Sequence, residues 1–93
     1  MRTEPVEIYS DASNAAIMRH PGRRFPGMLI QGDTLYSLSQ MAVRALAEAE
    51  PESEQWYELK DLADALRSRV DLYAQVLREH GMDVPFSHSS PRT

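Results

Sequence analysis

The sequence contains no cysteine, a single tryptophan and only four glycines in 93 residues. Without cysteine, disulfide bonds, thiolate metal sites and thiol nucleophiles are excluded. No apolar run approaches the roughly 18 residues that a membrane span needs, and the segment from Met1 to Tyr9 lacks the apolar core of a secretory signal. We therefore expect one cytoplasmic domain without a membrane anchor, near the lower size limit for independent folding.

Basic charge is also scarce, and it is unevenly distributed. The formal net charge of −4 argues against a general nucleic-acid binder. Residues 1–31 carry four arginines and three acidic residues, whereas residues 32–81 carry five basic and ten acidic residues. The two parts therefore have net charges of +1 and −5, and most of the acidity lies in the second part.

Three short strands are predicted in the first third of the chain. Residues 6–9 alternate apolar and polar side chains, which places Val6 and Ile8 on one face of a strand. Two Pro-Gly pairs between residues 20 and 27 predict a loop, because proline fixes one backbone angle and glycine permits a positive one. The predicted strands span about residues 5–9, 15–19 and 27–31.

Two helices are predicted to follow, over about residues 34–49 and 53–80. Asp33 or Thr34 can cap the first helix and Ser53 the second, while Gly81 is typical of the residue that ends a helix. The predicted fold class is α+β: a small three-stranded antiparallel sheet followed by a helical hairpin with a long second helix. Residues 1–86 are expected to form the single domain, and residues 87–93 a disordered tail.

The second predicted helix carries a heptad stripe, and Leu62, Leu72 and Val76 widen its apolar face. At about 28 residues it would be roughly 42 Å long, against roughly 24 Å for the first helix. About three turns would then lack a helical neighbour in the chain, unless the sheet and residues 82–86 fold back over them. We therefore predict a homodimer through this stripe, with self-association residues Trp56, Leu59, Leu66, Val70, Tyr73 and Leu77. The stripe also includes Ala63.

Patterns for catalysis or metal binding are missing from the sequence. His20, His80 and His88 show no metal-ligand spacing, and no serine lies in a Gly-x-Ser-x-Gly turn. Paired carboxylates such as Asp61 and Asp64 are typical of a solvated helix face. We expect no catalytic residue, metal or cofactor, and a protein that is not an enzyme.

A short basic loop is the one concentration of positive charge. Guanidinium groups can bind carboxylate or phosphate through two hydrogen bonds, and an aromatic ring offers a stacking face. The loop is therefore a candidate site for a partner or an anion. In the alternative interpretation it is a solvated loop, with Phe25 in the core and the arginines paired to the acidic helices. The candidate residues are Arg19, His20, Arg23, Arg24 and Phe25.

The segment from Phe25 to Leu35, with its Pro-Gly loop, a short strand and Gly32-Asp33-Thr34 before an alanine-rich helix, resembles the core of HicB-type antitoxins. The resemblance covers residues 15–49. It implies a partial RNase H-like βββα fold, oligomerisation, and neutralisation of a toxin-like protein partner. The chain lacks the C-terminal DNA-binding module that such antitoxins usually carry.

These observations favour a non-catalytic protein–protein interaction module with an antitoxin-like or immunity-like role. It would self-associate along the long helix and bind its partner through the basic loop or a sheet edge. One alternative is a small anion- or ligand-binding protein, or an enzyme, that uses His20, Arg23 and Arg24. The second alternative is a nucleic-acid adaptor.

Overall fold

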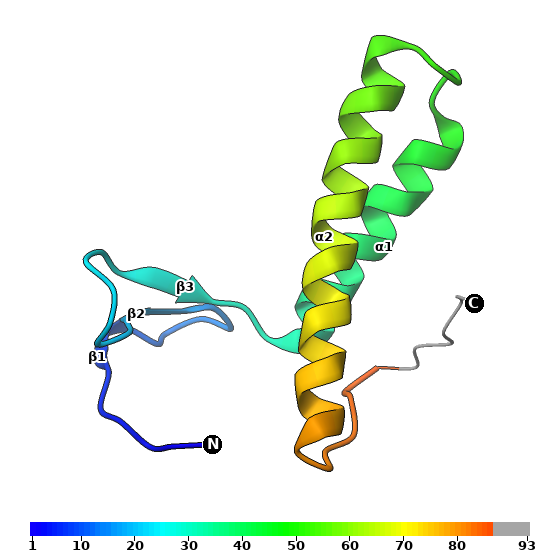
Figure 1. Ribbon diagram of the computed structural model, residues 1–93. Coiled ribbons are helices and arrows are strands. Elements are labelled where there is room, and N and C mark those ends of the chain that lie inside the picture. Colours follow the sequence, from blue (N-terminus) through cyan, green and yellow to red (C-terminus); the bar gives the residue numbers. More distant parts are fainter. Residues whose placement is uncertain (87–93) are drawn as a thin grey trace. The chain divides into compact units, whose positions relative to one another are not determined.

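The structure, a computed structural model, describes residues 1–86 and confirms the predicted α+β class (Figure 1). A three-stranded antiparallel sheet precedes two helices, the second of which is long. The chain divides into two compact units, Met1–Gln31 and Gly32–Thr93, which we call the sheet unit and the hairpin unit. The elements are β1 (Glu7–Ser10), β2 (Ala16–Arg19), β3 (Gly27–Leu29), α1 (Gly32–Glu48) and α2 (Glu54–Glu79).

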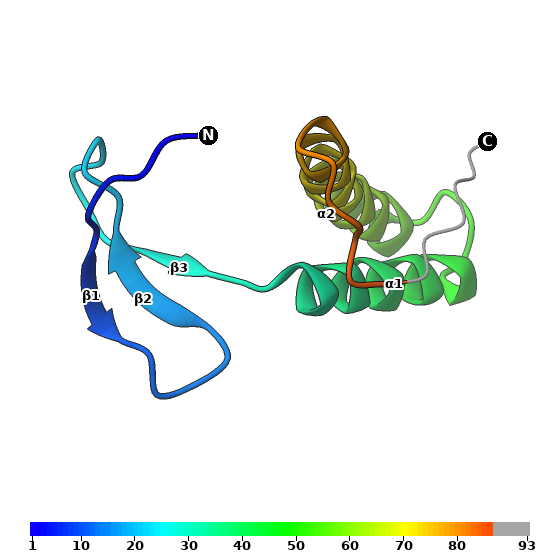
Figure 2. The ribbon, with the colours of Figure 1, turned by 90° about the horizontal axis from the view of Figure 1, so that it is seen from below.

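In the sheet unit, β2 is the central strand and pairs antiparallel with both neighbours (Figure 2). Glu7 is opposite Arg19 in the first pair, and Ile17 is opposite Met28 in the second. The register shifts between Ile8 and Ser10, and the first pairing continues beyond the shift with Ser10 opposite Ile17. Strands of three and four residues are short even for a small sheet.

The sheet unit has no buried residue at all, because each of residues 1–31 is exposed or half-buried. Its strands are exposed or at most half-buried, and Ile8, Tyr9 and Met28 are between 58% and 60% exposed. For independent stability in water, a small sheet needs three or more strands with a hydrophobic face, or it needs a helix packed against it. This unit therefore does not contain the core that would hold it together.

The ends of α2 follow their sequence signals. The Ser53 side chain accepts a hydrogen bond from the Trp56 amide at 3.1 Å and is the N-cap of α2, as predicted. Gly81 has a φ of 71°, and the Met82 amide donates to the Leu77 carbonyl at 2.9 Å. This is the pattern of a Schellman C-cap, which satisfies carbonyls that the end of a helix leaves free.

The helix α1 begins at Gly32, before the predicted cap residues. Asp33 therefore lies within the first turn, where its carboxylate accepts a hydrogen bond from the Thr34 amide at 2.8 Å. A negative charge in this turn is favourable because it faces the positive end of the helix dipole.

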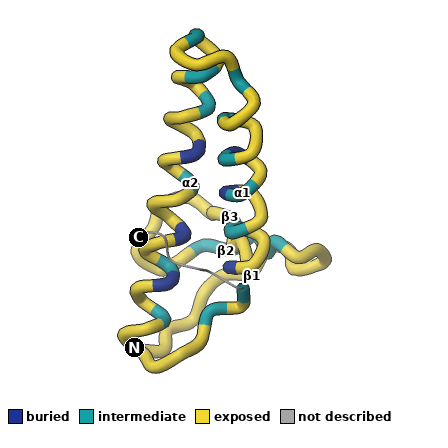
Figure 3. The backbone as a smooth tube through the Cα atoms, turned by 90° about the vertical axis from the view of Figure 1, so that its right-hand side faces the viewer, coloured by how far each residue is buried: buried dark blue, intermediate teal, exposed yellow. Residues whose placement is uncertain are grey.

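Small side chains form the contact between α1 and α2. The buried positions face each other across the hairpin (Figure 3), and none of them is larger than valine. Small residues let two helix backbones approach closely, but each of them removes little apolar surface from water. The buried set is Gly32, Ser39 and Ala42 on α1 with Ala63, Val70 and Ala74 on α2.

The Tyr73 ring packs directly on Gly32, where a Cβ atom would lie 2.2 Å from the ring carbon Cζ. Tyr73 therefore lies beside the first residue of α1, and α2 extends past α1 by only about two turns. The predicted overhang of about three turns, with Val70 inside it, was too long. Val70 is 3% exposed because α1 starts early enough to cover it.

The segment after α2 folds back across the hairpin unit towards α1, as Figure 2 shows. Its Phe86 ring stacks on Tyr36 of α1 with centroids 4.4 Å apart and an interplanar angle of 6°. The same ring lies 6.3 Å from the ring of Tyr73 on α2. The three rings join both helices on one side of the hairpin, at the end where α1 begins. The tail predicted over residues 87–93 lies outside the described residues.

The turn between the helices contains the one non-glycine residue with a positive φ in the described part of the chain, Glu52 at 67°. The Ser53 amide donates to the Glu50 carbonyl at 3.1 Å and closes the turn, with Pro51 and Glu52 at its centre. A positive φ at the third position is typical of a type II turn, which favours glycine or asparagine there.

We predict that Glu52→Gly raises the free energy of unfolding by about 0.5–1 kcal/mol, because it removes the Cβ penalty of a left-handed conformation. Glu52→Ala is the matched control, since it removes the charge but keeps the Cβ atom, and it should leave stability nearly unchanged. Urea denaturation of the three proteins measures the difference. A gain in Glu52→Ala equal to that in Glu52→Gly would contradict the backbone explanation.

We predict that Gly32→Ala destabilises the hairpin unit by about 1–3 kcal/mol, because the added methyl group displaces the Tyr73 ring. The cost should be strongly non-additive with Tyr73→Leu, which vacates the same space. Gly27→Ala is the control, since nothing lies within 4 Å of a Cβ atom at that position. Thermal unfolding followed by circular dichroism compares the wild type with Gly32→Ala, Tyr73→Leu, the double variant and Gly27→Ala. Additive effects in Gly32→Ala/Tyr73→Leu would contradict the contact.

Candidate functional site

The basic loop begins in a tight turn at the end of β2. The Arg23 amide donates to the His20 carbonyl at 2.9 Å, with Pro21 and Gly22 between them. The Gly22 amide also donates to the imidazole Nδ1 of His20 at 3.0 Å. Neither Gly22 nor Gly27 has a positive φ, contrary to the expectation for the Pro-Gly pairs. The turn thus rests on proline and on the His20 side chain rather than on the conformational freedom of glycine.

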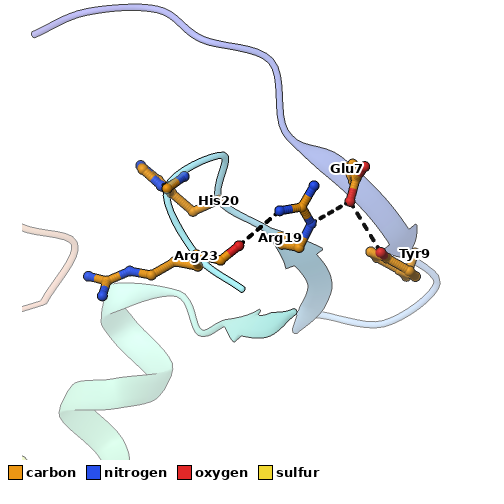
Figure 4. A network of polar contacts seen from close by, with 6 residues as sticks. Glu7, Tyr9, Arg19, His20 and Arg23 are labelled. Atoms are coloured by element: carbon orange, nitrogen blue, oxygen red, sulfur yellow. Dashed lines mark hydrogen bonds and ion pairs between the residues drawn. The ribbon is translucent and has the colours of Figure 1, made fainter. Parts of the chain in front are cut away.

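Arg19 holds this loop to the sheet from within (Figure 4). Its Nε atom lies 2.6 Å from Oε1 of Glu7, the residue opposite it on β1. Its Nη1 atom donates to the Arg23 carbonyl at 2.8 Å, and the Tyr9 hydroxyl donates to the same Glu7 oxygen at 3.2 Å. One guanidinium therefore joins β1, β2 and the loop, and it is committed to contacts inside the sheet unit.

The network shifts the ionisation of both charged groups. The hydrogen bond from Arg19, followed by that from Tyr9 and the charge of Arg19, lowers the pKa of Glu7 below its ordinary value. The hydrogen bond to Glu7 and then its charge raise the pKa of Arg19. Because the pKa of Glu7 is lowered by folding, the stabilisation is present above the ordinary range of a glutamate. It is lost as the pH falls through the lowered value.

A depression of about 540 Å³ opens beside the loop. Its lining combines apolar side chains with two arginines and a histidine, and no acidic residue lines it. The structure brings together four of the five predicted loop residues here, namely His20, Arg23, Arg24 and Phe25, while Arg19 does not line the depression. The lining is completed by Val6, Met18, Gly27, Met28 and Leu29.

The apolar lining was not predicted as part of the site, although the alternation of the strands contains a signal for it. Met18 and His20 are two residues apart along β2 and its continuation, and Gly27 is opposite Met18 on β3. Residues two apart on a strand share a face, and so do directly opposed residues. Arg19 lies between Met18 and His20, so its side chain leaves on the other face, towards Glu7.

The aromatic and basic side chains of the loop are available to a ligand. Phe25 is 72% exposed, so it is not the core residue that the alternative interpretation of the loop requires. The Arg24 guanidinium lies 5.5 Å from the centre of the Phe25 ring, a cation–π contact. In the described part of the chain, neither Arg23 nor Arg24 forms an ion pair with an acidic residue. The Arg24 guanidinium and the Phe25 ring thus form one platform, and Arg23 also lines the depression.

The predicted self-association stripe on α2 lies against α1. Its members are buried or half-buried in the hairpin unit, and Trp56 also makes an edge-to-face contact with Tyr57 at 5.0 Å. This side of α2 is therefore occupied by the chain's own first helix. Self-association stays a prediction, and the stripe to which it was assigned is Trp56, Leu59, Leu66, Val70, Tyr73 and Leu77.

The described residues contain no group of three or more histidine, aspartate or glutamate side chains that could hold a metal ion. Over the same residues, none of the helices has the length and apolar character needed to cross a membrane. The site is thus an open depression of arginine, histidine and apolar side chains on a small α+β chain.

The family described as a family of unknown function (DUF6959) matches residues 1–86. The chain belongs to this family. The match includes both units and the whole basic loop. Comparison with curated proteins and with solved structures finds no match.

We predict that Arg19→Gln returns the pKa of Glu7 towards its ordinary value and loosens the loop, because the charge and the hydrogen bond that hold the carboxylate are removed. Arg2→Gln is the control, since Arg2 pairs with Glu4 outside the sheet. NMR titration of the glutamate side-chain carbons measures the shift. An unchanged Glu7 titration in Arg19→Gln would contradict the network.

Proposed function

We propose that this protein is a non-catalytic binding module whose sheet unit docks another protein at the depression beside the basic loop. One observation carries the proposal: the sheet unit buries none of its residues, yet it surrounds two unpaired arginines with exposed apolar side chains. The cysteine-free sequence favours the cytoplasm as the place where this binding occurs.

The extent of the exposed surface favours a protein over a small molecule. Ligand pockets typically enclose most of their ligand, whereas Phe25 and Met28 at this depression are 72% and 58% exposed. Ile8 and Ile30 are also exposed but lie outside the depression. A ligand confined to about 540 Å³ would leave them in water, whereas a docked protein can cover them together with the depression.

The charge of the site defines the chemistry of the partner. The lining of the depression contains Arg23 and Arg24 and no acidic residue. The complementary surface is an acidic segment with apolar side chains, because guanidinium groups bind carboxylates through paired hydrogen bonds. The resemblance of residues 15–49 to HicB-type antitoxins supports an antitoxin-like or immunity-like role, in which the partner is a toxin-like protein.

The test places a photo-crosslinking benzoylphenylalanine at position 25 of the full chain, in the cells that naturally produce it. We expect an adduct with one protein, reduced at least about tenfold when Arg23 and Arg24 are both changed to glutamate. The same group at position 57, an exposed tyrosine of α2, is the control for chance collisions. An absence of charge-dependent protein adducts at position 25 would contradict the proposal.

The depression also gives the anion-binding alternative a specific basis, since its volume lies within the range of small-molecule sites. The probes are inorganic phosphate, citrate and octanoate, each titrated into the labelled protein and followed by NMR. Saturable shifts confined to residues 20–25 that disappear in Arg23→Ala/Arg24→Ala would favour that alternative. A nucleic-acid adduct at position 25 would favour the adaptor alternative.

A further inference from the structure

The hairpin unit has one covered side and one uncovered side. Phe86 covers one side, where it stacks on Tyr36, and Ala74 on the same flank of α2 is 2% exposed. The residues on the opposite flank of both helices remain in water. We call this second side the open face; its apolar members are Leu38, Met41 and Ala45 of α1 and Leu62, Ala65, Leu72 and Val76 of α2.

The helical repeat places these residues together. On α1, residues 38, 41 and 45 follow one another at spacings of three and four, and on α2 residues 62, 65, 69, 72 and 76 do the same. A hollow of about 600 Å³ between the helices is lined by Ala45 and Leu62, which shows that the two stripes border the same side of the hairpin. Leu38, Met41, Leu62, Leu72 and Val76 are between 38% and 60% exposed.

The α2 residues of the open face form a stripe that also carries two charges, Glu58 and Arg69, and these charges indicate the kind of surface that is complementary to it. Glu58 lies one turn before Leu62, and Arg69 lies one turn after Ala65, so the stripe reads acidic, apolar, apolar, basic. Neither charge forms an ion pair in the described part of the chain. The Arg69 guanidinium donates only to the carbonyl of Ala65 on its own helix, at 3.0 Å.

The order acidic, apolar, apolar, basic along α2 is complementary to the same order on a second α2 helix that runs in the opposite direction. In a dimer with twofold symmetry, residue i of one copy contacts residue j of the other, and j contacts i. An antiparallel pair of α2 helices with its axis between Leu62 and Ala65 places Glu58 of each copy opposite Arg69 of the other. It also sets the large Leu62 against the small Ala65, which lets the two helices interdigitate.

We infer that the open face is a homodimer interface, in which two hairpins pack with antiparallel α2 helices and two Glu58–Arg69 ion pairs join the copies. The four helices would form a bundle, with Met41 and Ala45 of α1 extending the contact beside the α2 pair. This surface is on the other unit from the proposed partner site, so either proposal can fail without the other.

The experiment uses charge reversal and sedimentation velocity on the full chain. Glu58→Arg places arginine against Arg69 of the other copy, and Arg69→Glu places glutamate against Glu58, so each variant creates two repulsive pairs at once. We expect each to raise the dimer dissociation constant about tenfold or more. Arg67→Glu, a reversal on the opposite flank of α2, is the matched control and should leave the constant nearly unchanged.

A mixture of Glu58→Arg and Arg69→Glu tests the proposed pairing most directly. In an equimolar mixture, the arginine introduced at position 58 of one chain meets the glutamate introduced at position 69 of the other, and the unchanged Glu58 and Arg69 meet each other. A heterodimer should therefore recover close to the wild-type constant, and so should the double variant Glu58→Arg/Arg69→Glu. Residues 58 and 69 are about 16 Å apart along one helix, so neither recovery can arise within a chain. Circular dichroism of each variant checks that the helices are intact.

A monomeric wild-type protein at concentrations up to about 1 mM would overturn the inference. So would a dimer whose dissociation constant does not respond to either reversal, because the copies would then join through another surface. Reversed variants that weaken the dimer but do not recover on mixing would also contradict the antiparallel register. Leu62→Asp, at a position 51% exposed, should separate the copies without unfolding the hairpin.

Discussion

Close packing of two helices through small side chains is the constraint on which this structure depends. The interior of the hairpin unit consists of residues no larger than valine, such as Ala42, Ala63 and Ala74, and no large side chain is fully buried in the described residues. Two helices in such contact have room for little else between them. The larger apolar side chains are therefore only half-buried beside this contact, as Leu59 and Leu66 are, or they lie exposed on the flanks of the hairpin and on the sheet.

This distribution leaves apolar side chains exposed on both units. The hairpin unit closes one flank with the stack of Tyr36, Phe86 and Tyr73, and leaves the other open. The sheet unit closes neither face with buried residues, and its internal bonds are the polar contacts of Arg19 with Glu7 and with the loop. Apolar surface that a chain does not bury itself is stabilising only when a partner or a second copy removes it from water. The depression beside the basic loop and the open face are the surfaces for which we propose such burial.

Local signals in the sequence predicted the fold class and the two ends of α2. Ser53 and Gly81 act through their own backbone and side chain, so they could be read without knowing the neighbours. The heptad stripe was also identified, but periodicity defines a face and not what covers that face. Whether α1 or a second chain covers Val70 depends on where α1 starts. The helix starts at Gly32, two residues before the predicted start. This start is compatible with the position of Tyr73 because the Tyr73 ring packs on a residue without a Cβ atom.

Only the basic half of the candidate site was predicted, because the apolar half depends on contacts between separate strands. The basic and aromatic composition of the loop placed five residues in one candidate site. The alternation of side chains along β2 shows that Arg19 and His20 leave on opposite faces, so Arg19 does not line the depression. Nothing in the sequence indicated the positive φ at Glu52, because the glycine or asparagine that ordinarily occupies this turn position is absent. The apolar half of the depression comes from three strands, and its assembly depends on their register, which no single segment specifies.

The central claim is that the sheet unit lacks a core of its own and is held by what covers it. Hydrogen–deuterium exchange of the dilute full chain, resolved by residue, tests this claim most directly. The account predicts strong protection of amides in the middle of α1 and α2, with rapid exchange in β1, β2 and β3 until a partner is bound. Strand amides as well protected as those of the helices, in a dilute chain without a partner, would contradict it.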